Sequence, residues 1–439
     1  MKLKFMFLMI LLLSVLVYSQ SRKIEFTEYD LSNGLHVILH QDNSTPIVAT
    51  TVTYHVGSKN EDADRTGFAH FFEHLMFEGT ENIERGEFDN IVQNAGGQLN
   101  AYTSFDETLY YLLLPSNQLE LALWLESERM FHAKIDTVGV ETQRNVVKEE
   151  RKQSIDNRPY GTFWEKTFGL AYTKHPYMWT PIGSAQYIDE ATIDEFREFY
   201  KTYYVPNNAV LCVAGDIDIE QTKILIDKYF SEIPKGKKEI QRPTAVEPKQ
   251  TTERRETVFD NIQLPAVIQA YHIPPQGTDD YYALNLLTNL LSSGESSRLN
   301  KTLVDEKRVA INVGSFPVSL EHPGVFIALA VANFGKTAEE CELAMDEEIN
   351  RVRTELISED EFIKIKNQVE SDFVMDKNRI AGIAMSLSKY HLFFNNTELI
   401  NTELENYAKV TREDLKRVAN EYLVPENRSV LYYLPKQAK

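Results

Sequence analysis

Two stretches about 220 residues apart repeat one local pattern, and this repeat constrains the fold more than any other feature of the sequence. Residues 192–195 (TIDE) are followed, thirteen positions later, by residues 205–208 (VPNN). Residues 411–414 (TRED) are followed at the same spacing by residues 424–427 (VPEN). Both places predict the end of a helix that leads into an apolar strand. We therefore expect two copies of one structural unit, one in each of two domains.

The length and the order of the predicted elements agree with two domains. The chain has 439 residues, which is more than one hydrophobic core usually serves. Strand-like and helix-like stretches alternate without strict regularity, which favours the α+β class. Residues 234–250 (PKGKKEIQRPTAVEPKQ) are polar, lysine-rich and contain proline, as linkers often do. We expect a first domain at 22–233, this linker, and a second domain at 251–439.

The N-terminal residues follow the order of a secretory signal peptide. Lys2 and Lys4 precede the mostly apolar run 5–17, and small or polar residues come next. Thirteen residues are too few to cross a bilayer comfortably as a permanent helix. We expect residues 1–21 to be a signal peptide and the protein to be exported, to the periplasm or outside the cell. The alternative is an uncleaved N-terminal anchor.

Charge and cysteine content narrow the function classes. Lys and Arg total 46 against 65 Asp and Glu, which gives a formal net charge of −19. Such a chain repels phosphate backbones, so nucleic-acid binding is disfavoured and basic or neutral partners are favoured. The two cysteines, Cys212 and Cys341, lack the CxxC spacing of a metal or redox site. We expect a fold that does not depend on a disulfide framework.

Residues 70–74 (HFFEH) carry the strongest chemical signal. Residues four apart in a helix lie one turn above the other, so His70 and His74 present two imidazoles to one ion. Glu73 borders the same face, where a carboxylate can take the proton of a metal-bound water. This order is the reversed zincin motif, and the apolar residues around it predict a buried helix. The sequence therefore predicts a hydrolytic zinc site.

A catalytic zinc normally has three protein ligands, so one more must come from elsewhere in the chain. The candidates lie in the predicted helix that contains residues 141–150 (ETQRNVVKEE). Helical periodicity alone leaves both Glu149 and Glu150 open.

Several strings together resemble the pitrilysin/insulinase family of zinc metallopeptidases. The resemblance is strongest to its short-chain branch, which includes the mitochondrial processing peptidase β subunit and bacterial zinc peptidases. The matching strings are residues 54–58 (YHVGS), 67–80 (GFAHFFEHLMFEGT), 97–104 (GQLNAYTS), 144–150 (RNVVKEE) and 157–161 (NRPYG). They cover the first half of the chain densely and the second half loosely. The resemblance implies two homologous αβ-roll domains that form half of a clam-shell.

The resemblance also implies roles for individual residues. It places the glutamate ligand 76 residues after the second histidine, which is Glu150, so that one zinc per chain is bound by His70, His74 and Glu150. Glu73 becomes the general base, and Glu149 stays as the alternative ligand.

Further positions follow from the same resemblance. Gln143 occupies a position where several members have a glutamate, two helical turns before Glu150, and is expected in the second shell of the metal. An edge strand near the zinc is expected to hold an extended substrate by backbone hydrogen bonds, through Asn100, Ala101, Tyr102 and Thr103.

The second half lacks a corresponding site. Asn285, Thr288 and Asn289 stand where the first half has its two histidines and glutamate. Many relatives carry an Arg and a Tyr that reach the substrate carbonyl, and those positions fall here on Val304 and Ile311, which donate no hydrogen bond. The resemblance therefore implies a heterodimer in which a zinc-less homologous subunit supplies the Arg and the Tyr. A homodimer is the alternative.

The leading hypothesis is an exported zinc endopeptidase that hydrolyses unfolded peptides or small proteins. A zinc-activated water attacks the peptide carbonyl, and Glu73 acts as the general base. The alternatives are a non-catalytic peptide-binding or assembly subunit of the same fold, and a metal-binding protein without hydrolysis.

Overall fold

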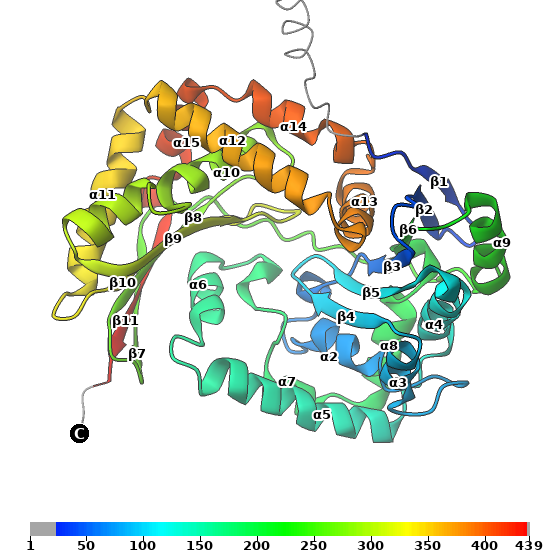
Figure 1. Ribbon diagram of the computed structural model, residues 1–439. Helices are drawn as coiled ribbons and strands as arrows, with labels where there is room; N and C mark the ends of the chain where they lie inside the picture. Colours follow the sequence, from blue (N-terminus) through cyan, green and yellow to red (C-terminus); the bar gives the residue numbers. More distant parts are fainter. Residues whose placement is uncertain (1–22, 437–439) are drawn as a thin grey trace, which may run out of the picture.

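The structure is a computed structural model that describes residues 23–436, and it contains two β-sheets with helices packed around them (Figure 1). The expected signal peptide at residues 1–21 lies outside the described residues. Within the described part of the chain, no helix combines the length and the apolar character needed to cross a membrane. The expected α+β class is confirmed.

The first sheet has six strands in the order β1-β2-β6-β3-β5-β4. Strands β2 and β6 are parallel, and every other neighbouring pair is antiparallel. Because β4 pairs with β5 alone, it forms one edge of the sheet, and β1 forms the opposite edge. The strands are β1 (Thr27–Asp30), β2 (His36–Gln41), β3 (Ile47–Tyr54), β4 (Gln98–Thr103), β5 (Thr108–Pro115) and β6 (Ala209–Gly215).

The second sheet repeats the topology of the first. Its order is β7-β11-β8-β10-β9, and β7 and β11 are its parallel pair, as β2 and β6 are in the first sheet. In both sheets the last strand in sequence inserts between two earlier strands. The strands are β7 (Arg254–Asp260), β8 (Ala266–His272), β9 (Ala310–Val318), β10 (Val325–Ala332) and β11 (Arg428–Pro435).

The repeated sequence pattern forms the same structure twice, which confirms the predicted repeat. Helices α8 (Ile193–Tyr203) and α15 (Arg412–Tyr422) both begin with a threonine capping box and lead through a 3-10 turn into the inserted strand. The side-chain amide of Asn208 donates to the carbonyls of Tyr203 and His55. Asn427 bonds in the equivalent way to Tyr422 and His272.

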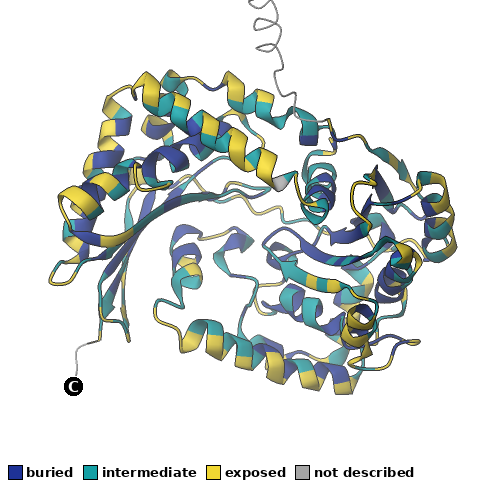
Figure 2. Cartoon of the chain, viewed as in Figure 1, coloured by how far each residue is buried: buried dark blue, intermediate teal, exposed yellow. Residues whose placement is uncertain are grey.

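Helices cover the sheets and complete the cores. Buried positions line the strands and the inner helix faces, whereas the outer helix faces are exposed (Figure 2). The first half contains α2 (Phe68–Leu75), α3 (Glu87–Asn94), α4 (Leu119–His132), α5 (Thr137–Arg151), α6 (Phe163–Ala171), α7 (Ala185–Glu190), α8 and α9 (Ile219–Phe230). The second half contains α10 (Asp279–Ser292), α11 (Ala338–Thr354), α12 (Glu359–Asp376), α13 (Ile380–Phe394), α14 (Leu399–Lys409) and α15. The short helical turns are η1 (Ser58–Asn60), η2 (Ser116–Gln118), η3 (Lys152–Asp156), η4 (Pro176–Met178), η5 (Pro206–Asn208), η6 (Asn300–Glu306) and η7 (Pro425–Asn427).

The two halves exchange one helix each. Helix α13 comes from the second half but packs on β3 and β6, where Leu387 joins a buried cluster with Ala49 and Cys212. Helix α6 comes from the first half but packs on β8 and β11, where Phe168 joins Ile268. Figure 1 shows both helices beside the sheet of the other half. The halves are therefore interlocked by hydrophobic packing.

The predicted linker at residues 234–250 contains no helix or strand. It nevertheless contacts both halves. Glu247 accepts hydrogen bonds from the backbone of residues 173–175, and the buried Gln250 donates to the carbonyl of Arg428. Arg242 donates to the carbonyl of His55. Residues 234–250 are therefore irregular but packed, and the expected domain limits at 22–233 and 251–439 stay predictions.

Candidate metal centre and active site

A buried carboxylate holds the first turn of α2, the helix that carries the two histidines. Glu61 accepts hydrogen bonds from the backbone N–H groups of Gly67 and Ala69 at 2.9 and 2.8 Å. Gly67 has a φ of 102°, a conformation that a side chain at this position would strain. Burial raises the pKa of Glu61 well above its usual range, and the two N–H groups partly offset that effect. Glu61 thus fixes where α2 begins.

Aromatic packing decides which face of α2 is buried. The rings of Phe68 and Phe71 both stack on Phe196 of α8, with centroids 4.6 Å apart in each pair. Because this face is turned inward, His70 and His74 lie on the opposite side, with 12% and 24% of their side chains exposed. The apolar residues of the motif therefore aim its two imidazoles away from the core.

Helix α5, which carries the candidate third ligand, is anchored at its start. Asp136 caps the helix by accepting from the N–H of Gly139 at 2.9 Å. Arg85 bridges this cap to Glu78, three residues after the end of α2, at 2.9 Å from Asp136 and 2.6 Å from Glu78. This bridge couples α5 to the segment that follows α2.

The middle and the end of α5 are fixed as well. The guanidinium of Arg144 donates to the backbone carbonyls of Ile188, Asp189 and Ala191 on and after α7. Directly after α5 the chain makes the π-helical turn η3, a feature that is frequent at functional sites. Glu150 lies in the last turn of α5, just before η3.

The three expected ligands converge. The Nε2 atoms of His70 and His74 are 3.4 Å apart. Glu150 places its Oε1 atom 3.6 Å from His70 Nε2 and its Oε2 atom 3.1 Å from His74 Nε2. A tetrahedral zinc with bonds of about 2.1 Å separates its ligand atoms by about 3.4 Å. The three donor atoms are therefore spaced as ligands of one zinc ion would be.

Charge and exposure separate the two candidate glutamates. Hydrogen bonding to His70, and then to His74, lowers the pKa of Glu150 well below its usual range. Glu149 is 60% exposed and pairs with Lys152 at 2.5 Å. Of the two positions that helical periodicity left open, the structure brings Glu150 to the imidazoles.

Glu73 lies beside the candidate ligands and is held by a hydroxyl group. Its Oε2 atom accepts a hydrogen bond of 2.7 Å from Thr103 Oγ1 at the end of β4. Glu73 and His74 line a cavity of about 350 Å³ together with Asn100 and Ala101 of β4. This arrangement brings the candidate general base, a candidate metal ligand and the edge strand β4 to one cavity.

Strand β4 carries the four residues expected to hold substrate. It is the edge strand of the first sheet, so one side of its backbone has no neighbouring strand among the described residues. Asn100 bonds the N–H of Ala101 with its own side chain at 2.9 Å, and Tyr102 donates to Glu107 at 2.8 Å. Thr103 has the additional contact with Glu73, which no sequence pattern predicts.

Gln143, expected in the second shell, lines the same cavity as Glu73 and His74. Its amide nitrogen donates to Glu78 Oε1 at 2.6 Å, and no hydrogen bond joins it to Glu150 among the described residues. Its hydrogen bond therefore goes to the Glu78–Arg85 pair and not to the candidate ligand Glu150. Sequence reasoning missed Glu61, Glu78 and Arg85, because their partners lie in other elements and no local pattern marks them.

The second half offers no equivalent centre among the described residues. Asn285 on α10 donates to the carbonyl of Tyr281, one turn earlier in its own helix. Val304 lies in η6, and Ile311 lies on the edge strand β9 with 48% exposure. Two groups of side chains among the described residues are spaced so that they could hold a metal ion: the His70 group and a second one formed by Glu28, His36 and His391.

The sequence of this chain is similar to those of known peptidases. The family pattern "Insulinase (Peptidase family M16)" matches residues 36–163, and the pattern "Peptidase M16 inactive domain" matches residues 190–369. The zinc protease PqqE of Helicobacter pylori is 33% identical over 422 residues, which is 95% of this chain and 95% of that protein.

Solved structures show the same fold. A protease from Helicobacter pylori superposes with a TM-score of 0.90 at 32% identity, over 94% of this chain and 100% of that one. The periplasmic protease PqqL from Escherichia coli superposes with a TM-score of 0.77 at 19% identity, over 94% of this chain but 48% of that one. The fold of this chain therefore corresponds to about half of PqqL.

Proposed function

Because this chain belongs to the insulinase family of peptidases (family M16), we propose that it is a zinc-dependent endopeptidase acting on unfolded peptides or small proteins. One observation carries the proposal: side chains from α2 and α5, 76 residues apart in sequence, meet at zinc-ligand spacing beside the carboxylate of Glu73. The ligands of the ion are His70, His74 and Glu150, with one such ion per chain.

The residues divide the chemistry between them. When bound, zinc supplies Lewis acidity and lowers the pKa of the attacking water. Glu73 accepts the proton of that water and later delivers it to the amine that leaves. Thr103 keeps the Glu73 carboxylate in position through its hydroxyl group. Gln143 steadies the surroundings of the ligands through Glu78.

Substrate binds along β4. An extended peptide adds to the open edge of the sheet by backbone hydrogen bonds at Asn100, Ala101, Tyr102 and Thr103, which makes binding tolerant of sequence. A cavity of about 710 Å³ adjoins the end of β4 and is lined by Phe105, Ile155 and Trp164, among others. Its apolar walls suit a large apolar side chain of the substrate.

The active assembly includes a second homologous subunit. Neither Val304 nor Ile311 can donate a hydrogen bond to a substrate carbonyl, and loss of such a donor costs about a hundredfold in rate. PqqL, in which this fold covers about half of one chain, supports a pairing of two such units. We propose a zinc-less partner that supplies the Arg and the Tyr, in an exported complex. Co-purification tests this, since a homodimer would contradict the heterodimer.

The test of the chemistry is Glu73→Gln. The variant is expected to retain zinc, because Glu73 is not a ligand, and to lose at least about 100-fold of its peptide hydrolysis. Glu149→Gln, an exposed change three residues before η3 begins at Lys152, is the matched control and is expected to keep both properties. Unchanged hydrolysis in Glu73→Gln would overturn the role of Glu73. Absence of zinc from the unmodified protein would favour a non-catalytic peptide-binding or assembly subunit.

A further inference from the structure

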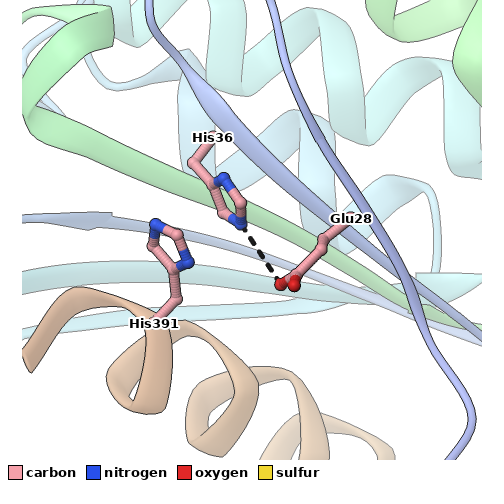
Figure 3. A group of neighbouring side chains, drawn as sticks. All are labelled: Glu28, His36 and His391. Atoms are coloured by element: carbon pink, nitrogen blue, oxygen red, sulfur yellow. Dashed lines mark ion pairs between the residues drawn. The ribbon is translucent and has the colours of Figure 1, made fainter. Parts of the chain in front are cut away.

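A second group of metal-binding side chains lies where the two halves of the chain meet. Glu28 on β1, His36 on β2 and His391 on α13 bring their candidate ligand atoms within 4.8 Å of one another (Figure 3). Strands β1 and β2 lie at the edge of the first sheet opposite β4, so this group is separate from the His70 centre. The proposed peptidase chemistry does not use any of these three residues.

The hydrogen bonding of His36 leaves one ring nitrogen without a donor or an acceptor. Its Nδ1 atom is 2.8 Å from Asp30 Oδ1, and a carboxylate at this position favours the tautomer with the proton on Nδ1. The Nε2 atom then carries the lone pair. It is buried without a hydrogen-bond partner and faces Glu28 Oε2 at 3.5 Å. Two acceptor atoms that face each other, here His36 Nε2 and Glu28 Oε2, repel, and a cation bound between them would replace this repulsion with attraction.

The charges around the His36 ring also favour a bound cation. Glu28 and Asp30 both approach His36, and neither has another ion-pair partner among the described residues. The hydroxyl of Thr397 donates to Glu28 Oε2 at 2.5 Å, which fixes that carboxylate beside the imidazole. Two carboxylates therefore share one imidazole, and a divalent cation between Glu28 and His36 would balance them.

His391 supplies the third donor. Its ring stacks on that of His36, with centroids 3.3 Å apart and planes within 10° of parallel. No hydrogen bond holds the ring of His391 within the described part of the chain. A ligand nitrogen of His391 lies within 4.8 Å of the ligand atoms of Glu28 and His36, so the ring must turn out of the stack to bind the same ion.

We propose that Glu28, His36 and His391 bind a second Zn²⁺ ion, which ties β1 and β2 of the first half to α13 of the second. Two imidazole nitrogens and one carboxylate oxygen suit zinc, and Asp30 orients the His36 ligand from behind. The ion strengthens a seam that already exists. The side-chain amide of Asn401 bonds both the N–H and the carbonyl of Ile24, at 2.8 and 3.0 Å.

The proposal is tested where the first centre cannot contribute. In the double variant His70→Gln, Glu150→Gln, purified protein dialysed against a zinc buffer is expected to keep one equivalent of zinc. Adding His391→Gln, or in a separate variant Glu28→Gln, is expected to remove it. In the otherwise unmodified chain, His391→Gln is expected to reduce zinc from two equivalents to one.

A control and a second measurement accompany the metal analysis. His132→Gln is the matched control, because His132 also pairs with a carboxylate, Glu81 at 3.1 Å, but belongs to no such group of three among the described residues. It is expected to leave the zinc content unchanged. Added zinc is expected to raise the Tm of the double variant by several degrees. When Glu28→Gln is added to the double variant, zinc is expected to leave the Tm unchanged.

Two outcomes would overturn the proposal. One is that the double variant binds no zinc and that added zinc does not raise its Tm at neutral pH. This result would mean that the Glu28, His36 and His391 cluster holds only a proton. The other is bound zinc that neither His391→Gln nor Glu28→Gln removes.

Discussion

At the scale of single residues, the position of the candidate general base depends on a neighbour in a different element. Glu73 is on α2, and the hydroxyl that holds it belongs to Thr103 on the edge strand. A carboxylate that accepts a hydrogen bond in a partly buried site loses orientation when the donor is removed. Thr103 is therefore a positioning residue, which acts through Glu73.

The prediction for this residue is a selective loss of turnover. Thr103→Val is expected to lower kcat about 10-fold or more, as loss of a hydrogen bond to a charged group does, with a much smaller change in KM. Zinc content is expected to stay unchanged, and Thr103→Ser is expected to restore kcat. Steady-state kinetics with an unstructured peptide provide the measurement. An unchanged kcat, or a change confined to KM, would mean that Thr103 does not position the base.

Prediction from the sequence succeeded for residues whose geometry is local. The spacing of His70 and His74 within one helix fixes their common face before any fold is known, and the structure places both imidazoles there. Glu150 could be reached only through family resemblance, because helical periodicity gives no register between α2 and α5. The contact of Gln143 with Glu78 was not predictable, since it depends on how the two helices are braced.

At the scale of elements, the position of α5 depends on one buried guanidinium. Arg144 bonds three backbone carbonyls at the end of α7 and just after it. If the Arg144 guanidinium were removed, these carbonyls would lose their hydrogen-bond donor, and a buried acceptor without a donor destabilises the folded state. The orientation of the helix that carries Glu150 is thus coupled to α7.

Arg144→Met is expected to lower the free energy of unfolding by about 2–4 kcal/mol, because a charged hydrogen-bonding group is lost from a buried position. Urea unfolding provides the measurement. Arg197→Met is the control, since Arg197 is 45% exposed and its ion pair with Asp194 is on the surface. Equal stability of the two variants would contradict the role given to Arg144.

The elements themselves were largely predictable, and their partners were not. The helix around residues 70–74 follows from apolar spacing, and the helix that leads into the strand after residues 205–208 follows from the repeated pattern. The exchange of α6 and α13 between the halves was not foreseen, because periodicity marks an apolar face without naming the sheet that covers it.

At the scale of the whole molecule, buried histidines lie where the halves meet. His175 is 2% exposed and packs between Tyr177 and His322, with ring centroids 4.2 and 4.8 Å away. Burial, and to a lesser degree His322, lowers the pKa of His175 to about 4. The folded protein therefore favours the neutral imidazole.

This shift predicts a loss of stability in mild acid. Between pH 6.5 and about 4 the unfolded chain binds more protons than the folded one, so the free energy of unfolding decreases as the pH falls through that range. His175→Asn keeps an acceptor for the N–H of Tyr177 but does not titrate there, and is expected to flatten this slope. Urea unfolding at several pH values between 7 and 4 measures how the free energy of unfolding changes with pH. A slope equal to that of the unmodified protein would contradict the prediction.

The central claim is that Glu150 completes a zinc site with His70 and His74, and metal analysis of two neighbouring variants tests it most directly. Glu150→Gln and Glu149→Gln are compared in a His391→Gln background, so that the second proposed site cannot contribute. Glu150→Gln is expected to weaken zinc binding by more than about 100-fold and to abolish peptide hydrolysis, whereas Glu149→Gln keeps both. Undiminished zinc affinity in Glu150→Gln would contradict the account.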